Sequence, residues 1–186
     1  MTPQRKLILV KHASPEQVPS IDACEWHLSH KGRADCAPLA EMLRPAIPAA
    51  LFCSVESKAT ETAQLIGATL GLTAKPVLGL HEHDRRNALY FHNAEDFETA
   101  IRQLFAQPDT QVYGNETAAA AATRFSRAIA QVQTLTPVEQ SAIVVAHGTV
   151  ITLFVAAHNT IDPFKFWKGL KLPSMVVLTW AGKLML

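Results

Sequence analysis

LILVKHASPE, residues 7–16, changes from apolar to polar at its midpoint, where four apolar residues meet a lysine and a histidine. A short, continuous apolar run with β-branched members is typical of a strand buried on both faces, so 7–10 is predicted to be such a strand. Lys11 and His12 then follow its carboxyl end. A cation and an imidazole at that position either belong to a functional site or mark the point where the strand reaches the surface.

The rest of the chain alternates between short apolar segments and segments with helical periodicity. Apolar residues on one helix face, followed by a terminator such as Gly71, predict helices between the strands. The predicted strands are 7–10, 51–53, 142–146 and 175–180, with a hairpin return at 183–186. The predicted helices are 30–44, 59–70, 95–106, 116–135 with Asn115 as its N-cap, and 149–157. Pro38 lies inside the first of these and either kinks that helix or delays its start.

This alternation predicts the class of fold. Strands separated by helices form a mostly parallel sheet with helices on both faces. We therefore expect a single α/β domain over residues 1–186, built as a three-layer α/β/α sandwich. In such sheets ligands bind beyond the carboxyl ends of the strands. His12, Ser54 and His147 each follow a predicted strand, so they should converge at one edge of the sheet.

The composition argues against several functional classes. The formal net charge is +1, from 17 Lys and Arg against 16 Asp and Glu, which gives no reason to expect nucleic acid or an anionic membrane as a partner. The most apolar window, 142–157, is shorter than a membrane span and contains a histidine and a glycine. Three cysteines without a CxxC pair indicate reduced thiols, so we expect a cytoplasmic protein. Nothing in the sequence predicts its oligomeric state.

The residues at the predicted sheet edge fit phosphoryl chemistry. A neutral imidazole such as that of His12 is a competent nucleophile and needs no cofactor. A phosphoryl group is a natural electrophile for it, because its oxygens require nearby cations such as Lys11. Gly148 follows the second strand-end histidine, His147. It would let the backbone N–H groups of a helix start, near Thr149, approach an anion closely.

Six segments, in this order, resemble the histidine phosphatase superfamily, whose fold is the phosphoglycerate mutase-like fold. LILVKHASPE resembles the opening signature of a strand and Arg-His-Gly, with Lys-His-Ala in its place. LSHKGRADCAPLAEML (28–43) resembles a segment where Gly-Arg begins a helix, and LFCSVESKATETAQLIGATLGL (51–72) resembles the second strand and helix. LHEHDR (80–85) lies where the family has an acidic proton donor, and GNETAAAAATRF (114–125) resembles a Gly-Glu-Ser segment. VVAHGTVITLFVA (144–156) resembles the second histidine motif.

The resemblance implies a metal-independent phosphatase with no cofactor. His12 would attack phosphorus and become phosphohistidine, while Glu82 would protonate the leaving oxygen and then activate water. The catalytic residues implied are His12, Glu82 and His147. The residues implied to surround the phosphoryl oxygens are Lys11, Lys58, His147 and Thr149. Outside this family context, LHEHDR is typical of a solvated loop and Lys58 of a solvated surface lysine.

Three departures from the family pattern concern phosphate binding. Lys11 and Lys58 stand where the family has two phosphate-binding arginines, and a lysine offers a point charge instead of a planar two-pronged grip. Ala13 stands where the family has a glycine, and its methyl group either crowds the backbone approach or is tolerated. An alternative function follows, in which a low-activity or inactive member binds phosphate or a phosphorylated ligand as a regulatory module.

The expected partner is a phosphorylated small molecule or a phosphoprotein. Ser14, Arg85 and Arg86 are possible substrate contacts, and the two arginines either bind a second anionic group or are solvated. Segment 82–114 is the main insertion that could cover the site. Mutases of the family are typically longer than this chain, so phosphomonoester hydrolysis is favoured, with phosphohistidine hydrolysis as the second option. A metal hydrolase built on HEH at 81–83 is a third hypothesis, but the sequence has no HExxH spacing.

Overall fold

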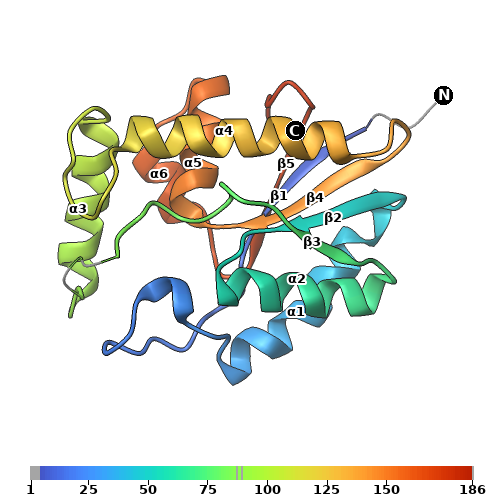
Figure 1. The fold of residues 1–186 in the computed structure, drawn as a ribbon, viewed down its shortest axis with the longest axis horizontal. Helices are drawn as coiled ribbons and strands as arrows, with labels where there is room; N and C mark the ends of the chain where they lie inside the picture. Colours follow the sequence, from blue (N-terminus) through green and yellow to red (C-terminus); the bar gives the residue numbers. More distant parts are fainter. Residues whose placement is uncertain (1–4, 87, 89, 186) are drawn as a thin grey trace.

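A five-stranded sheet forms the centre of the molecule in the computed structural model, which describes residues 5–86, 88 and 90–185 (Figure 1). The strands are β1 (Leu7–Lys11), β2 (Ala49–Cys53), β3 (Ala74–Pro76), β4 (Ser141–Ala146) and β5 (Ser174–Leu178). Their order across the sheet is β3-β2-β4-β1-β5. The first four are parallel to their neighbours and β5 is antiparallel to β1, so the sheet is mixed but mostly parallel, as predicted.

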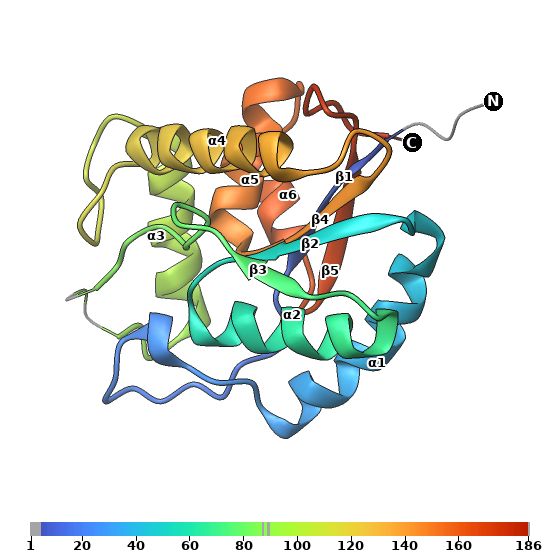
Figure 2. The same ribbon diagram turned by 45° about the vertical axis from the view of Figure 1, so that its right-hand side comes forward.

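Helices cover both faces of this sheet. The helices are α1 (His30–Leu43), α2 (Ser57–Leu70), α3 (Ala94–Ala106), α4 (Ala118–Leu135), α5 (Gly148–His158) and α6 (Pro163–Gly169), with short 3₁₀ turns η1 (Ala23–Glu25) and η2 (Arg44–Ala46). Figures 1 and 2 show α1 and α2 on one face and α4, α5 and α6 on the other, while α3 stands at the end of the sheet away from the chain termini. The predicted three-layer α/β/α arrangement is confirmed.

The side-chain alternation of β1 explains why the strand needs apolar residues at every position. Successive side chains of a strand point to opposite faces. Leu7 and Leu9 pack in the core beneath α4 and α5, while Ile8 and Val10 pack in the core beneath α1 and α2. Both faces are therefore buried, as the continuous apolar run indicated.

Helix starts and ends follow local chemistry. Ser29 caps α1 by accepting the Gly32 N–H at 3.0 Å, so Pro38 does not delay the helix start. Gly71 ends α2 with a φ of 70°, as predicted. The predicted cap of α4 was wrong: Thr117, not Asn115, accepts the N–H of Ala120, and the helix begins two residues later than expected.

One strand and one α-helix were not predicted. β3 is a three-residue edge strand whose sequence, Ala-Lys-Pro, carries no apolar run. α6 is only seven residues long, begins with a proline after the cap Asp162, and buries only Phe164. The predicted C-terminal return is confirmed by an antiparallel bridge between Leu178 and Leu184, although β5 ends at Leu178 and not at Trp180. Within the described part of the chain, no helix is both long and apolar enough to cross a membrane.

Candidate active site

The ends of β1, β2 and β4 meet at one edge of the sheet, as the sequence predicted. The N–H of His12 donates to the carbonyl of Ala146 at 3.0 Å, and the N–H of Ser54 donates to that of Val145 at 2.9 Å. These bonds continue the parallel ladder one residue beyond β1 and β2. They bring His12, Ser54 and the following His147 into one cluster.

The protonation of His12 is fixed by its own loop. Its Nδ1 lies 2.7 Å from the carbonyl oxygen of Ala13, and a carbonyl can only accept a hydrogen bond. Nδ1 therefore carries the proton, and Nε2 of the neutral ring keeps its lone pair. Burial, followed by the charges of His147 and Lys58, lowers the pKa of His12 well below its usual value. The ring is thus a neutral imidazole with a free nucleophilic nitrogen.

His147 packs against His12 at the centre of the cluster. The two rings are 5.1 Å apart between centroids and nearly edge-on, and the side chain of His147 is fully buried. Its Nε2 lies 2.9 Å from the hydroxyl oxygen of Ser54, while its Nδ1 has no hydrogen-bond partner among the described residues. Burial, with Lys58 next, lowers the pKa of His147 well below its usual value. An unpartnered buried nitrogen beside a nucleophile is a polar group able to contact a ligand.

Glu82 reaches the same cluster from a distant loop. Its carboxylate accepts the N–H of Thr149 at 3.1 Å and the N–H of Val150 at 3.2 Å, so it sits on the N-terminal turn of α5. A helix N-terminus favours a negative charge there. The backbone N–H of Thr149, which was expected to face phosphate, is therefore occupied by Glu82. The Thr149 side chain is buried beside it.

Lys11 spans the opening between β1 and α6. Its ammonium donates to the carbonyl of Leu170 at 2.8 Å and lies 6.0 Å from the ring centre of Trp167. Burial lowers its pKa, and the charge of Glu82 opposes that shift. A Cβ on Gly148 would lie 3.1 Å from Lys11 Cε and 3.4 Å from the indole nitrogen of Trp167, so a larger residue there would require the end of the Lys11 side chain to shift.

Lys58 points into the cluster but is already partnered. Its ammonium donates to the carboxylate of Glu56 at 2.5 Å and to the carbonyl of Ala23 at 2.6 Å. The side chains of Lys58 and Glu56 are only 3% and 8% exposed. Glu56 also accepts the N–H of Glu82 at 2.7 Å and lies 3.7 Å from Nε2 of His147. Sequence reasoning missed Glu56, because a glutamate in the polar turn before a helix carries no signal of burial.

The sequence did not predict a role for Arg124 either. From α4 it donates to the backbone carbonyls of Gly79, His81 and Glu82 at 2.7–3.0 Å and pairs with Glu116. Five N–H donors in a fixed fork suit it to this clamp. The Arg124 side chain therefore holds the backbone that presents Glu82. The sequence gives no signal for this role, because α4 holds two arginines, Arg124 and Arg127, in the same polar pattern.

The three possible substrate contacts have different environments. The backbone carbonyl of Ser14 accepts the N–H and hydroxyl of Ser29, which ties the loop after His12 to α1. Arg86 forms a two-pronged pair with Asp84 at 2.6 and 3.0 Å, which lowers the pKa of Asp84 to about 2. Arg85 lies over the ring of Phe97 at 5.2 Å. Arg86 is thus engaged by a carboxylate, whereas Arg85 contacts an aromatic face.

Ala13 does not crowd the cluster. It is fully buried and packs with Leu28 and Cys36, and its N–H donates to the hydroxyl of Thr62 at 3.0 Å. The methyl group therefore fills a small apolar core beside α1. Of the two possibilities open for this residue, tolerance is the one that the packing supports.

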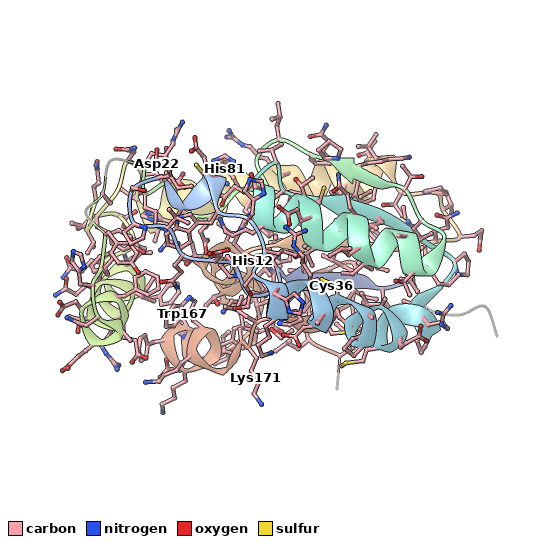
Figure 3. The ribbon with its side chains drawn as sticks, turned by 90° about the horizontal axis from the view of Figure 1, so that it is seen from below. His12, Asp22, Cys36, His81, Trp167 and Lys171 are labelled. Atoms are coloured by element: carbon pink, nitrogen blue, oxygen red, sulfur yellow. The ribbon has the colours of Figure 1, made fainter. Side chains whose placement is uncertain are left out.

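Two cavities adjoin the Glu82 loop. One of about 390 Å³ is lined by Glu56, His81 and Glu82, and one of about 550 Å³ is lined by the aromatic side chains Trp26, Tyr90, Phe91 and Phe97. Arg85 and Ala23 border both cavities. Segment 82–114 contributes walls to each, although residues 87 and 89 lie outside the described part. Figure 3 shows His12 between His81 on one side and Trp167 and Lys171 on the other.

The metal hypothesis finds no matching geometry. Among the described residues, no group of three or more His, Cys, Asp or Glu side chains could hold a metal ion. His83, the second histidine of the HEH triplet, instead approaches the carbonyl of Glu116 at 2.8 Å through Nε2.

The structure is an α/β sandwich with two histidines paired at the sheet edge, and comparison with known families identifies its class. The chain belongs to the histidine phosphatase superfamily (branch 1), whose model matches residues 7–184. The predicted family and fold are thereby confirmed. A search of curated proteins finds no match.

Several solved structures share this fold at low sequence identity. A mycobacterial glucosyl-3-phosphoglycerate phosphatase with VO3 is 21% identical, with a TM-score of 0.72 over 93% of this chain and 92% of the other. "Mycobacterial hydrolase 2" is 21% identical, with a TM-score of 0.74 over 93% and 81%. A phosphoserine phosphatase from Entamoeba histolytica with 3-phosphoglyceric acid is 15% identical, with a TM-score of 0.71 over 94% and 90%. These distant relatives are phosphatases or hydrolases, and the likeness establishes the fold.

Proposed function

We propose that this chain is a phosphatase that hydrolyses a phosphomonoester through a phosphohistidine formed on His12. The observation that carries this proposal is the Nδ1–H bond of His12 to the Ala13 carbonyl, which leaves Nε2 free to attack. A ring that is held neutral is ready to act as a nucleophile near neutral pH. The relatives with VO3 and with 3-phosphoglyceric acid support a phosphorylated small molecule as the substrate.

The reaction would proceed in two displacements. Nε2 of His12 attacks phosphorus as the P–O bond to the leaving group breaks, and protonated Glu82 gives its proton to the leaving oxygen. Glu82 then takes a proton from water, whose oxygen attacks phosphorus as the P–N bond breaks. The side chains of Lys11, Lys58 and His147 would stabilise the negative charge on the phosphoryl oxygens.

Hydrolysis of 4-nitrophenyl phosphate tests this function. We expect turnover that EDTA does not change, and a loss of at least about 10³-fold in kcat when His12 is replaced by Ala. An exposed histidine, His30, provides the matched control, because His30→Ala should leave kcat unchanged. Turnover that survives in His12→Ala would contradict the mechanism.

The alternative is a regulatory module that binds phosphate and turns it over poorly. The engagement of both lysines favours it: Lys11 is bonded to the Leu170 carbonyl, and Lys58 to Glu56. Phosphate binding by calorimetry without hydrolysis would support this alternative. Under it, Lys11→Arg with Lys58→Arg should raise activity, and no gain would show that the lysines are not the defect. Ala13→Gly is expected to add nothing, because the methyl group packs away from the cluster.

A further inference from the structure

The buried carboxylate of Glu56 is the feature of the site that the proposed mechanism does not use. It stands between the cation of Lys58 at 2.5 Å and Nε2 of His147 at 3.7 Å. A charged group with so little exposure is stable only when it is paired and hydrogen-bonded. Lys58 and the N–H of Glu82 supply those partners for Glu56.

The Glu56–Lys58 pair changes how strongly the charges of the cluster attract an incoming phosphate. Lys11 and Lys58 are the cations assigned to phosphate, and Glu56 and Glu82 are carboxylates beside them. Both histidines are held neutral by burial. The charge of Glu56 thus cancels that of Lys58, whereas a phosphomonoester carries nearly two negative charges at neutral pH.

We propose that Glu56 is a specificity-determining residue that competes with the phosphoryl group for Lys58 and so sets the affinity of the site for phosphate. The inference rests on the proposed phosphate site and extends it. The Glu56 carboxylate holds the Lys58 ammonium and so reduces the attraction that this cation offers to phosphate. Its own negative charge also repels the phosphate directly. The site should therefore bind a dianion weakly as built, and more tightly once Glu56 loses its charge.

A double-mutant cycle on phosphate affinity tests this competition, because it separates the charge of Glu56 from that of its partner. Inorganic phosphate is titrated by calorimetry into the whole protein, the variants Glu56→Gln and Lys58→Met, and the double variant. We expect Glu56→Gln to bind phosphate about tenfold tighter and Lys58→Met to bind it at least about tenfold more weakly. The double variant should bind within about threefold of Lys58→Met, and so more weakly than the parent protein, because the charge of Glu56 can compete for Lys58 only while Lys58 is present.

Glu139 provides the control. It is exposed and lies before the start of β4, at the opposite edge of the sheet from the cluster, so Glu139→Gln removes the same charge without touching the site. Its phosphate affinity should equal that of the parent protein. A gain in Glu139→Gln as large as in Glu56→Gln would reduce the effect to net charge and overturn the proposal.

The remaining outcomes also decide. Equal or weaker binding in Glu56→Gln overturns the competition, and so does a double variant that binds as tightly as the parent protein, since additive effects would mean that Glu56 acts independently of Lys58. If a single variant fails to fold because it leaves a buried charge unpaired, the double variant alone decides, since it leaves none. Loss of turnover with the cycle intact would reject the phosphatase while retaining the competition. No phosphate binding in any protein would reject the phosphate site and this inference together.

Discussion

One neighbouring carbonyl, that of Ala13, determines the tautomer of the His12 imidazole. Because the Ala13 oxygen fixes the proton on Nδ1, the reactive nitrogen is Nε2 and not the nitrogen that is bonded to the backbone of its own loop. The adjacent alanine contributes through packing, and the adjacent lysine through its reach to α6. Each residue of the Lys-His-Ala triplet thus has a separate physical task.

Glu82→Gln tests the assigned proton donor at this scale. The amide has a single acceptor oxygen, so it keeps only one of the two N–H contacts with the N-terminal turn of α5. It cannot give a proton, so kcat should fall by about 10²–10⁴-fold with an alkyl phosphate. The loss should be smaller with 4-nitrophenyl phosphate, whose leaving group needs little protonation. Steady-state kinetics with both substrates measure the difference. An equal loss with both would mean that Glu82 acts by position alone.

The two buried histidines predict a pH dependence of stability. Their pKa values are lowered in the folded state, so between pH 7 and 5.5 the unfolded chain binds protons that the folded chain does not. The free energy of unfolding should therefore fall by about 2 kcal/mol over that range, since each group with an unfolded pKa near 6.5 contributes roughly 1 kcal/mol. Urea unfolding at both pH values measures this change.

A substitution of one buried histidine tests whether this pH dependence of the free energy of unfolding comes from the site. His147→Asn should remove about half of the fall, whereas replacing exposed His30 by Asn should leave it unchanged. A slope that is the same in all three proteins would place its origin elsewhere in the chain.

At the scale of elements, the loop after His12 is held by the first turn of α1. Gly32 is the contact point, because a Cβ there would lie 2.1 Å from the carbonyl oxygen of Ser14. No side chain can occupy that space unless the loop or the helix moves. The position of His12 therefore depends on Gly32, a residue of α1 that takes no part in the proposed reaction.

Gly32→Ala tests that dependence. We expect it to destabilise the protein by about 3 kcal/mol or more, despite the better helix propensity of alanine. Gly169→Ala is the matched control, since its added Cβ would meet no heavy atom within 4 Å among the described residues other than its chain neighbours and its own helix backbone. It should change stability by less than about 0.5 kcal/mol. Similar denaturant midpoints for both variants would contradict the proposed contact.

Over the whole molecule, periodicity predicted the elements that bury a broad apolar face, and it missed those that do not. β1 and β4 are recognisable because both faces are buried, whereas the edge strand β3 needs only backbone pairing. Seven-residue α6 is too short to show a period. At the site, His12 and His147 could be predicted because each follows the end of a buried strand. The Glu56–Lys58 pair could not be predicted. Buried pairing is decided by tertiary contacts, which a polar turn does not reveal.

Trapping the phosphoenzyme tests the central claim most directly. The protein is mixed with a phosphomonoester that it turns over, quenched at alkaline pH where the P–N bond survives, and digested for peptide mass spectrometry. The mechanism predicts one phosphoryl group on Nε2 of His12 during turnover, and none in His12→Ala. Turnover with no label on His12, or label on another residue, would contradict it.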